Sequence, residues 1–450
     1  MSRRSNIPPA SFWRASVASV ASVASVASVA SVVLAIAASF ACAPSDSDLA
    51  PTYARDIAPL LAERCVGCHQ TGQIAPFRLD DYASARMYST LSRAAVERRA
   101  MPPVNVDQSG ACQTFRDATW LTDEEIALFG RWIEQGWPEG EAPPPIVAPP
   151  APPAEPPLEA SFTAQMLEPY TPSPSSQDPS EDRCFLLDTL PAEPAFVTGF
   201  EFIPGQRRLV RYAVLAQVVS DAAEAEVEAL DRDDPRPGWA CAHGSGSPDD
   251  VRGLGLWAPG VGATRYPEGT GIRLLAGRPL ILLVHYYLAE APAPDQTAVR
   301  LALTRSVAKE AVIAPLQNPR IEIPPGRESF EVRRGLPLLL LGLPEFELYG
   351  VAPLMNGLGV TQVFEARSTM DDAAPHECLS RVDDWKPNWP RFSFYRAPVV
   401  VRADQTVLLT CTYDSRRRDE PTFFGDGTRD ERCLIFLYGV LPRGQDLPSY

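Results

Sequence analysis

Cys65-Val66-Gly67-Cys68-His69 (CVGCH) is the most informative stretch of this 450-residue chain. Cysteines three positions apart on a helical turn place both thiols on one side of it, and the histidine follows directly. This C-x-x-C-H spacing is the attachment motif of c-type haem, in which the thiols form thioethers and the imidazole is the proximal iron ligand. A chance match or a dithiol redox pair is the alternative. The motif predicts covalent haem c held by Cys65, Cys68 and His69.

Haem iron in electron-transfer cytochromes usually takes a methionine as its second axial ligand, which raises the reduction potential. Met101, in Arg99-Ala100-Met101-Pro102-Pro103, is our candidate because it follows the motif at the distance of a loop that could fold over the haem. Met87 is the alternative, but it falls within an expected helix over residues 83–95. With both axial positions filled, outer-sphere electron transfer is expected, without an open site for oxygen.

The residues around the motif have helical spacing. Ile57, Leu60 and Leu61 share one helical face, and Thr122 to Glu125 form a capping box before an apolar stripe. Together with the CVGCH motif, Met101 and the Trp132-Ile133 pair, this region resembles the small class I cytochrome c domains of exported bacterial proteins. The resemblance covers Thr52 to Gly140, and we place an all-α cytochrome c domain at residues 43–140.

The first 42 residues have the layout of an export signal. Arg3, Arg4 and Arg14 precede an uncharged, partly repetitive run that ends in Ala41-Cys42. Lipoprotein processing with lipidation of Cys42 is the interpretation we adopt, although Ser39 replaces the usual leucine. Ordinary signal cleavage and a retained membrane anchor are the alternatives. All three export the chain to a periplasmic or outer-envelope location, where disulfides form.

The composition changes after the helical region. Residues 141–157 (EAPPPIVAPPAPPAEPP) predict a semi-rigid proline-rich linker. Short apolar stretches separated by Gly, Pro and Asp then predict strands, and at this length two β-sandwiches are expected. We place them at residues 158–306 and 307–450. The expected strands include residues 209–218, 280–288, 336–343 and 399–412. The fold class is therefore multidomain, all-α followed by two all-β sandwiches.

Eight ordered strings in the β half resemble the copper type II, ascorbate-dependent monooxygenases, the group of peptidylglycine α-hydroxylating monooxygenase and dopamine β-monooxygenase. They span about Ser161 to Gly439 and imply that family's two jelly-roll domains. The strings begin at Asp182, Leu209, Gly238, Trp257, Val284, Pro353, Trp385 and Gly425. The resemblance also implies two disulfides, Cys184–Cys241 and Cys411–Cys433. Cys112 and Cys378 remain, and a bridge between them is left open.

The family binds two copper ions, and this sequence departs from its ligand pattern at five of six positions. The departures are Arg211, Tyr212, Leu354, Asn356 and Arg432, and His285 is the sole retained ligand position. Copper needs several neutral imidazoles or soft sulfurs converging on it, so copper binding is not expected. For His285 a structural role in a strand outweighs a metal role, and Met355 is expected to pack. Neither His243 nor His376 has an evident second ligand nearby.

The charge of the chain also restricts its function. A net charge of −15 argues against nucleic acid as a partner, because phosphate backbones attract cations. Our first hypothesis is an exported, membrane-tethered c-type cytochrome with a copper-free β module. That module would act as a docking or binding scaffold, with Arg211, Tyr212 and Arg432 suited to an anionic or polar ligand. A redox protein or small molecule would exchange electrons with the haem.

Two other hypotheses remain open. One is an active copper monooxygenase supplied with electrons by its own haem domain, for which the tether would raise the effective concentration. The other is a structural or assembly subunit with a vestigial haem. The complete CVGCH motif and the Met101 loop argue against the vestigial haem.

Overall fold

The structure is a computed structural model. It describes residues 50–441 except 142–157, 174–178, 242–249, 289–290, 342–344, 369–375, 388, 426 and 428. The export signal with Cys42, the proline-rich linker from residue 142 onward, and His243 lie outside the described residues. Among the helices that are described, none is both long and apolar enough to cross a bilayer.

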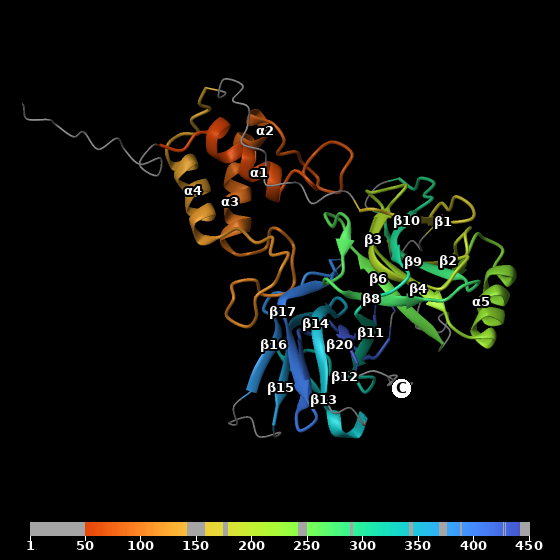
Figure 1. The fold of residues 1–450 in the computed structure, drawn as a ribbon. Helices are drawn as coiled ribbons and strands as arrows, with labels where there is room; N and C mark the ends of the chain where they lie inside the picture. Colours follow the sequence, from red (N-terminus) through yellow and green to blue (C-terminus); the bar gives the residue numbers. More distant parts are fainter. Residues whose placement is uncertain are drawn as a thin grey trace, which may run out of the picture. The chain divides into compact units, whose positions relative to one another are not determined.

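Residues 50–140 form short helices joined by long loops (Figure 1). The elements are the π-helix η2 (Tyr53–Ile57) and the α-helices α1 (Ala58–Arg64), α2 (Tyr82–Met87), α3 (Ser89–Glu97) and α4 (Asp123–Glu134). The Thr122 side chain accepts from the Glu125 N–H, and the Glu125 side chain accepts from the Thr122 N–H. The predicted capping box is therefore present at the start of α4. Ile57, Leu61 and Trp132 form the core of this region. The expected helix over residues 83–95 is interrupted at Tyr88, between α2 and α3.

The next region is mostly β-sheet, as predicted. Its strands are β1 (Phe162–Gln165), β2 (Ser180–Leu186), β3 (Ala195–Ile203), β4 (Val210–Val218), β5 (Trp239–Ala240), β6 (Val251–Trp257), β7 (Thr264–Arg265), β8 (Thr270–Leu274), β9 (Leu280–Tyr287) and β10 (Ala298–Thr304). Strands β5, β2, β9, β4 and β6 form a five-stranded sheet. Its apolar face packs with Phe200, Ile272 and Leu301 of a second sheet in one core.

The last region adds strands β11 (Lys309–Gln317), β12 (Glu322–Ile323), β13 (Phe330–Pro337), β14 (Glu345–Leu354), β15 (Gly359–Arg367), β16 (His376–Val382), β17 (Ser393–Arg402), β18 (Thr406–Tyr413), β19 (Thr422–Phe423) and β20 (Leu434–Val440). Strands β13, β18, β15 and β16 form a four-stranded sheet. Phe364 and Leu409 from this sheet share a core with Val351 and Ile435. Both β regions are therefore consistent with β-sandwiches.

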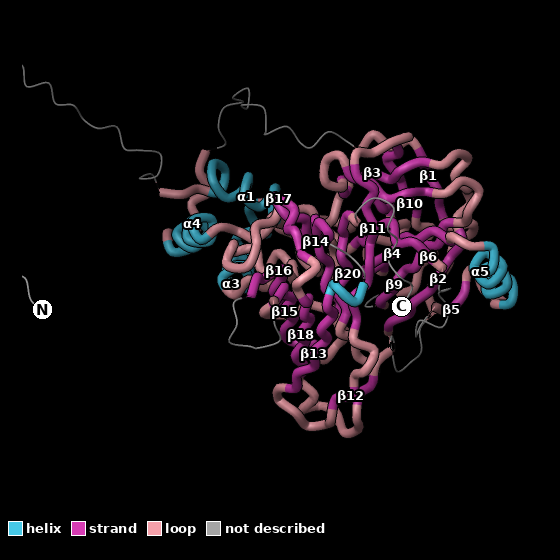
Figure 2. The backbone as a smooth tube through the Cα atoms, turned by 60° about the horizontal axis from the view of Figure 1, so that its bottom comes forward, coloured by secondary structure: helices cyan, strands magenta, loops and turns pink. Residues whose placement is uncertain are grey.

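One sheet of nine strands continues across the predicted boundary at residue 307. Its order is β1-β10-β3-β8-β11-β20-β14-β17, with β7 attached to β3. The crossing pair is β8 and β11, which run parallel with Lys309 opposite Thr270. Figure 2 shows β17, β14, β20 and β11, four successive strands of this sheet. The two sandwiches therefore share a hydrogen-bonded layer, which individual strand patterns did not indicate.

Three local predictions were wrong. Residues 336–343 are the end of β13 and the 3-10 helix η4 (Leu338–Leu341) instead of one strand. Residues 399–412 contain the turn between β17 and β18. The region predicted to be all-β also includes α5 (Asp221–Asp233). Ser220 caps this helix, and Val227 packs against Trp239, so apolar burial favours a helix there.

The segment 104–121, which follows Met101, is fastened to the C-terminal β region and is called the tethered segment. The Asp107 N–H donates to the Arg381 carbonyl oxygen at 2.7 Å, and the Arg116 N–H donates to that of Phe394 at 2.7 Å. Phe115 stacks on Tyr395, with ring centroids 5.3 Å apart. These contacts attach the end of the expected Met101 loop to strands β16 and β17.

Three disulfides join the described cysteines. Cys184–Cys241 and Cys411–Cys433 are the two pairs implied by the family resemblance. Cys112–Cys378, which the sequence left open, links the tethered segment to β16 across 266 positions of sequence. Cys65 and Cys68 are both free. Three disulfides indicate an oxidising, exported environment.

Candidate functional site

The CVGCH stretch forms a single turn that continues from α1. The Cys65 N–H donates to the Leu61 carbonyl oxygen at 2.8 Å, and the His69 N–H donates to that of Cys65 at 2.9 Å. The Cys68 N–H also donates to the Cys65 oxygen, at 3.1 Å. This turn brings both thiols and the imidazole to the wall of one cavity, as the spacing predicts.

A backbone hydrogen bond fixes the orientation of the His69 ring. Its Nδ1 lies 3.0 Å from the carbonyl oxygen of Phe77. A carbonyl oxygen only accepts, so Nδ1 carries the proton and Nε2 keeps its lone pair. Burial lowers the pKa of His69, against the opposing effect of the Phe77 hydrogen bond. The imidazole is therefore a neutral, oriented donor that could coordinate a metal through Nε2.

Burial also keeps the two thiols protonated. It raises the pKa of Cys65 to about 12, with a further contribution from neighbouring Cys68. The pKa of Cys68 is raised by burial too, against the pull of Arg391. A reactive redox cysteine needs a lowered pKa, so the pair does not resemble a dithiol redox centre.

A cavity of about 400 Å³ brings together the four predicted residues, Cys65, Cys68, His69 and Met101. Apolar side chains from two stretches of the helical region line much of it: Ile74, Ala75, Pro76, Phe77, Leu79, Leu91, Ala95 and Val96. Mostly apolar walls with a few donors at fixed positions are typical of cofactor sites. The arrangement could hold a flat apolar cofactor between His69 and Met101.

The structure distinguishes between the two methionine candidates. Met101 lines the cavity, although 40% of its surface is exposed. Met87 is 73% exposed, stands at the end of α2 and does not line this cavity. Met101 is therefore the methionine that could provide a second ligand in this cavity.

Five cavity-lining residues come from the β regions, and the sequence did not associate any of them with the CVGCH motif. They are Arg211, Pro259, Gly260, Trp389 and Arg391. Gly260 lies so close that a Cβ added there would be 2.8 Å from the Cys68 sulfur. The Trp257-Ala258-Pro259-Gly260 string was noticed only as part of the family pattern. Contacts between distant parts of the chain leave no local signal that could have revealed these residues.

The first copper-ligand set of the family corresponds here to Arg211, Tyr212 and His285. Tyr212 on β4 and His285 on β9 are register partners whose rings stack at 4.5 Å with an interplanar angle of 6°. The Asp182 carboxylate on β2 accepts a 2.6 Å hydrogen bond from His285 Nδ1. The histidine is thus held on both sides by protein groups, which agrees with the structural role expected for it.

The second ligand set corresponds to Leu354, Asn356 and Arg432. The Asn356 side chain donates to the Gly425 and Asp430 carbonyl oxygens at 3.1 and 3.2 Å. Glu431, beside Arg432, accepts from the backbone N–H groups of Asn356, Leu358 and Arg432. Met355 is buried in the neighbouring core, as expected. These polar groups stabilise the loop after β14.

The His376 imidazole is paired with a carboxylate. His376 is the first residue of β16, and its Nε2 lies 3.0 Å from the carboxylate of Glu365 on β15. Within the part of the chain that the structure describes, no three His, Cys, Asp or Glu side chains gather as they would around a metal ion. A haem iron held by His69 and Met101 does not need such a group.

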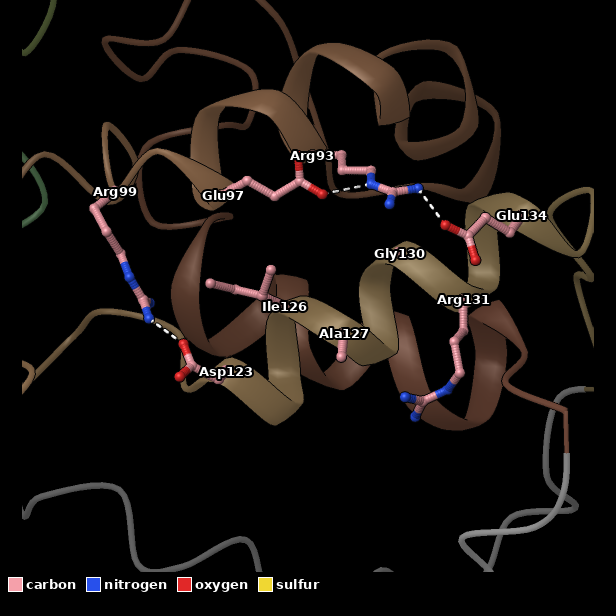
Figure 3. A pocket seen from close by; sticks show the side chains of 9 residues that line it. All are labelled: Arg93, Glu97, Arg99, Asp123, Ile126, Ala127, Gly130, Arg131 and Glu134. Atoms are coloured by element: carbon pink, nitrogen blue, oxygen red, sulfur yellow. Dashed lines mark hydrogen bonds and ion pairs between the residues drawn. The ribbon is translucent and has the colours of Figure 1, made fainter.

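A second hollow lies between α3 and α4 (Figure 3). Arg93 points toward Glu97 and Glu134, at 2.7 and 2.9 Å, and Arg99 contacts Asp123. The acidic side chains of this hollow are therefore paired within it. The hollow adds no chemistry to the cavity beside the CVGCH turn.

Comparison with known proteins relates the C-terminal β region to copper enzymes. Residues 361–442, which run from within β15 to just past the end of β20, match the family model described as "Copper type II ascorbate-dependent monooxygenase, C-terminal domain". Dopamine beta-hydroxylase of Canis lupus familiaris is 24% identical over 203 residues, 41% of this chain and 31% of the relative. Tyramine beta-hydroxylase of Caenorhabditis briggsae is 37% identical over 60 residues, 13% of this chain and 10% of the relative.

The chain therefore covers about a third or less of these relatives. Among solved structures, that of infectious bursal disease virus Gx strain aligns over 64% of this chain and 73% of its own. It is 9% identical with a TM-score of 0.17, too low to support any argument. A relation to the monooxygenase family is supported for the β part of the molecule.

Proposed function

We propose that this chain is an exported c-type cytochrome that binds haem covalently and transfers electrons, fused to a copper monooxygenase-like β module. The observation that carries the proposal is that one cavity gathers Cys65, Cys68, His69 and Met101. Bound there, haem supplies reversible one-electron chemistry at iron. Accordingly, residues 43–140 would be a class I cytochrome c domain.

The residues of the cavity fit that cofactor. The two unpaired thiols on one turn could form thioethers, and the fixed His69 ring could hold the iron through Nε2. Met101 lines the same cavity and could hold the iron through its sulfur. The apolar walls exclude water, which favours outer-sphere transfer over reactions of the iron with solvent.

We further propose that the β module does not act as a copper enzyme and serves as a docking or binding scaffold. At the first copper position Asp182 and Tyr212 hold His285, and Arg211 brings a permanent positive charge. At the second, Asn356 is committed to backbone oxygens and Leu354 has no lone pair. The donors that copper requires are thus largely replaced.

An active copper monooxygenase fed by its own haem is the second candidate. The family-model match at residues 361–442 favours it, because that family is defined by copper and ascorbate. It requires His285 to bind copper with ligands other than the family's set. Two coppers per chain and ascorbate oxidation would establish it and refute the scaffold role.

The test is metal and haem analysis of the purified mature protein after copper loading and dialysis. We expect one iron, no copper and a reversible haem spectrum, with the haem retained in denaturing electrophoresis. Cys65→Ser with Cys68→Ser should remove the covalent haem, and His69→Asn should change the spectrum. His376→Asn is the matched control and should change neither. A wild-type protein without covalent haem would refute the proposal.

The location and partners are proposed on the same basis. The three disulfides fit an exported protein, and lipidation of Cys42 would tether it to an envelope membrane. A redox protein or small molecule would exchange electrons at the haem, and a small polar ligand could bind the β module. Mass spectrometry of the mature N-terminus, with Cys42→Ser as the comparison, tests the tether.

A further inference from the structure

The cavity beside the CVGCH turn is strongly cationic. Its charged lining residues are Arg64, Arg98, Arg211 and Arg391, against a single carboxylate, Glu63. Arg64 lies 3.3 Å from Glu63 and 3.5 Å from Glu125, so its positive charge is balanced locally. A cavity with this excess is suited to a ligand that carries more than one negative charge.

Arg391 is the most informative of these residues. It precedes β17 by two positions and is half-buried where it lines the cavity. Its Nη2 donates to the Thr119 hydroxyl at 2.9 Å, and no carboxylate of the described residues lies within ion-pair distance. Asp117 acts on it only at longer range and pairs with Arg116 at 3.1 Å.

Burial of this guanidinium has an energetic cost. It lowers the pKa of Arg391 to about 10, against the opposing pull of Asp117. A buried charge is stable only when a counter-charge and hydrogen bonds compensate for the lost hydration. Because the protein supplies only a hydroxyl partner, the compensating anion is expected to come from the ligand of the cavity.

Arg211 reaches the same cavity from the N-terminal β region because of a bulge in β4. Val210 pairs with Tyr286 and Tyr212 with the adjacent residue His285, so Arg211 is the extra residue between them. Bulges redirect side chains in this way. The guanidinium carbon of Arg211 lies 5.1 Å from the centre of the Tyr287 ring, which supports its position.

We propose that Arg391 and Arg211 are the counter-charges for the two carboxylates of the haem, so that both β regions complete the haem site. This inference rests on the proposed function, because it takes haem as the occupant of the cavity. It assigns Arg211 a role at a position that the copper family uses for a ligand. The β module is then a structural part of the electron-transfer centre.

The two arginines act through the haem and are positioning residues with an electrostatic effect on its potential. Ferric iron carries one more positive charge than ferrous iron, so a nearby guanidinium disfavours the ferric state. Removing one should therefore lower the midpoint potential. We expect the ratio of reduced to oxidised haem at a fixed potential to fall about tenfold, which is about 59 mV for one electron.

The experiment is a spectroelectrochemical titration of the full-length holoprotein at low and high salt. Arg391→Gln and Arg211→Gln are compared with Arg391→Lys, which keeps the charge. Arg402→Gln is the matched control, because Arg402 lies exposed on β17, pairs with Asp404 and does not line the cavity. Covalent haem content and the absorption spectrum are measured for each variant.

We expect Arg391→Gln and Arg211→Gln to lower the midpoint potential. Arg391→Lys should keep a midpoint potential close to that of the wild type, and Arg402→Gln should leave it unchanged. Covalent haem with unchanged potentials in both glutamine variants would overturn the inference while leaving the cytochrome proposal intact. If Arg391→Gln does not fold, the result for Arg211→Gln decides. Absence of covalent haem from the wild type would refute both proposals.

Discussion

Glu431 is buried in the loop that corresponds to the second copper position of the monooxygenase family. Its carboxylate accepts from the N–H groups of Asn356, Leu358 and Arg432, yet burial raises its pKa from 4.5 to about 7. The folded protein therefore binds this proton more tightly than the unfolded chain does. The stability it contributes is fully present below about pH 4.5 and is lost as the pH rises through 7.

Glu431→Gln is expected to remove this pH dependence. A shift of this size corresponds to about 3 kcal/mol between the two limits. The unfolding free energy of the wild type should fall by about that amount between pH 4.5 and 8, beyond the change in the variant. Denaturant unfolding at both pH values measures the difference. Glu322→Gln, at an exposed carboxylate on β12, should retain the wild-type change, and an identical slope in Glu431→Gln would contradict the prediction.

Met101 provides a second test at the scale of one residue. If its sulfur is the second axial ligand, replacing it by histidine should lower the midpoint potential, because a thioether favours ferrous iron more than an imidazole does. The expected change is several tens of millivolts or more, of the order of tenfold or greater in the redox equilibrium. Redox titration measures it. Met87→His is the matched control at an exposed position, and equal potentials in the two variants would exclude Met101 as the ligand.

At the scale of elements, the predictions that depended on local chemistry agree best with the structure. The capping box at Thr122 gave the start of α4, and alternating apolar runs gave β4 and β9. The expected strand over residues 399–412 merged two strands, although the residues from Arg402 to Thr406 between them are mostly polar and contain the turn at Asp404. The acidic α5 was not predicted. Its signals are the Ser220 cap and the helical spacing of Ala223 and Val227, and they lie within a region whose other segments are strands.

The contribution of the capping box to the stability of α4 can be measured. Thr122→Ala removes the hydroxyl that accepts from the Glu125 N–H at 3.2 Å, which should cost about 1 kcal/mol at the start of α4. Hydrogen exchange at the Glu125 and Ile126 amides should accelerate about fivefold. Thr163→Ala on the exposed strand β1 makes the same chemical change elsewhere and should leave α4 protected. Unchanged exchange in the Thr122 variant would show that the cap contributes little.

At the scale of the whole molecule, the sequence predicted the residues of the CVGCH region that form the site but not the residues of the β regions that line the same cavity. Cys65, Cys68, His69 and Met101 were recognised from spacing and residue chemistry, and they line one cavity. Arg391 was not recognised as a site residue. Nothing in the sequence near β17 shows that the residues before this strand lie beside a turn more than 300 positions earlier. The sheet that joins β8 to β11 was missed for the same reason: strand pairing at a distance depends on tertiary register.

The disulfide Cys112–Cys378 cross-links the helical region to the β module. Replacing both cysteines by serine should destabilise the protein by about 2–5 kcal/mol, because the bond closes a long loop in the unfolded chain. It should also loosen the tethered segment, and through it Met101 and the contact of Arg391 with Thr119. If both β regions complete the haem site, the midpoint potential should fall as it does in Arg391→Gln.

Limited proteolysis and redox titration of Cys112→Ser with Cys378→Ser measure these two effects. Cys184→Ser with Cys241→Ser is the matched control, because it removes a disulfide within the N-terminal β region. That control should lose stability without new cleavage within residues 104–121 and without a change in potential. Cleavage of the tethered segment together with an unchanged potential in the first variant would mean that the β module fastens the loop without tuning the haem. A lowered midpoint potential without cleavage would mean that the change in potential comes from the arginines and not from loosening of the tethered segment.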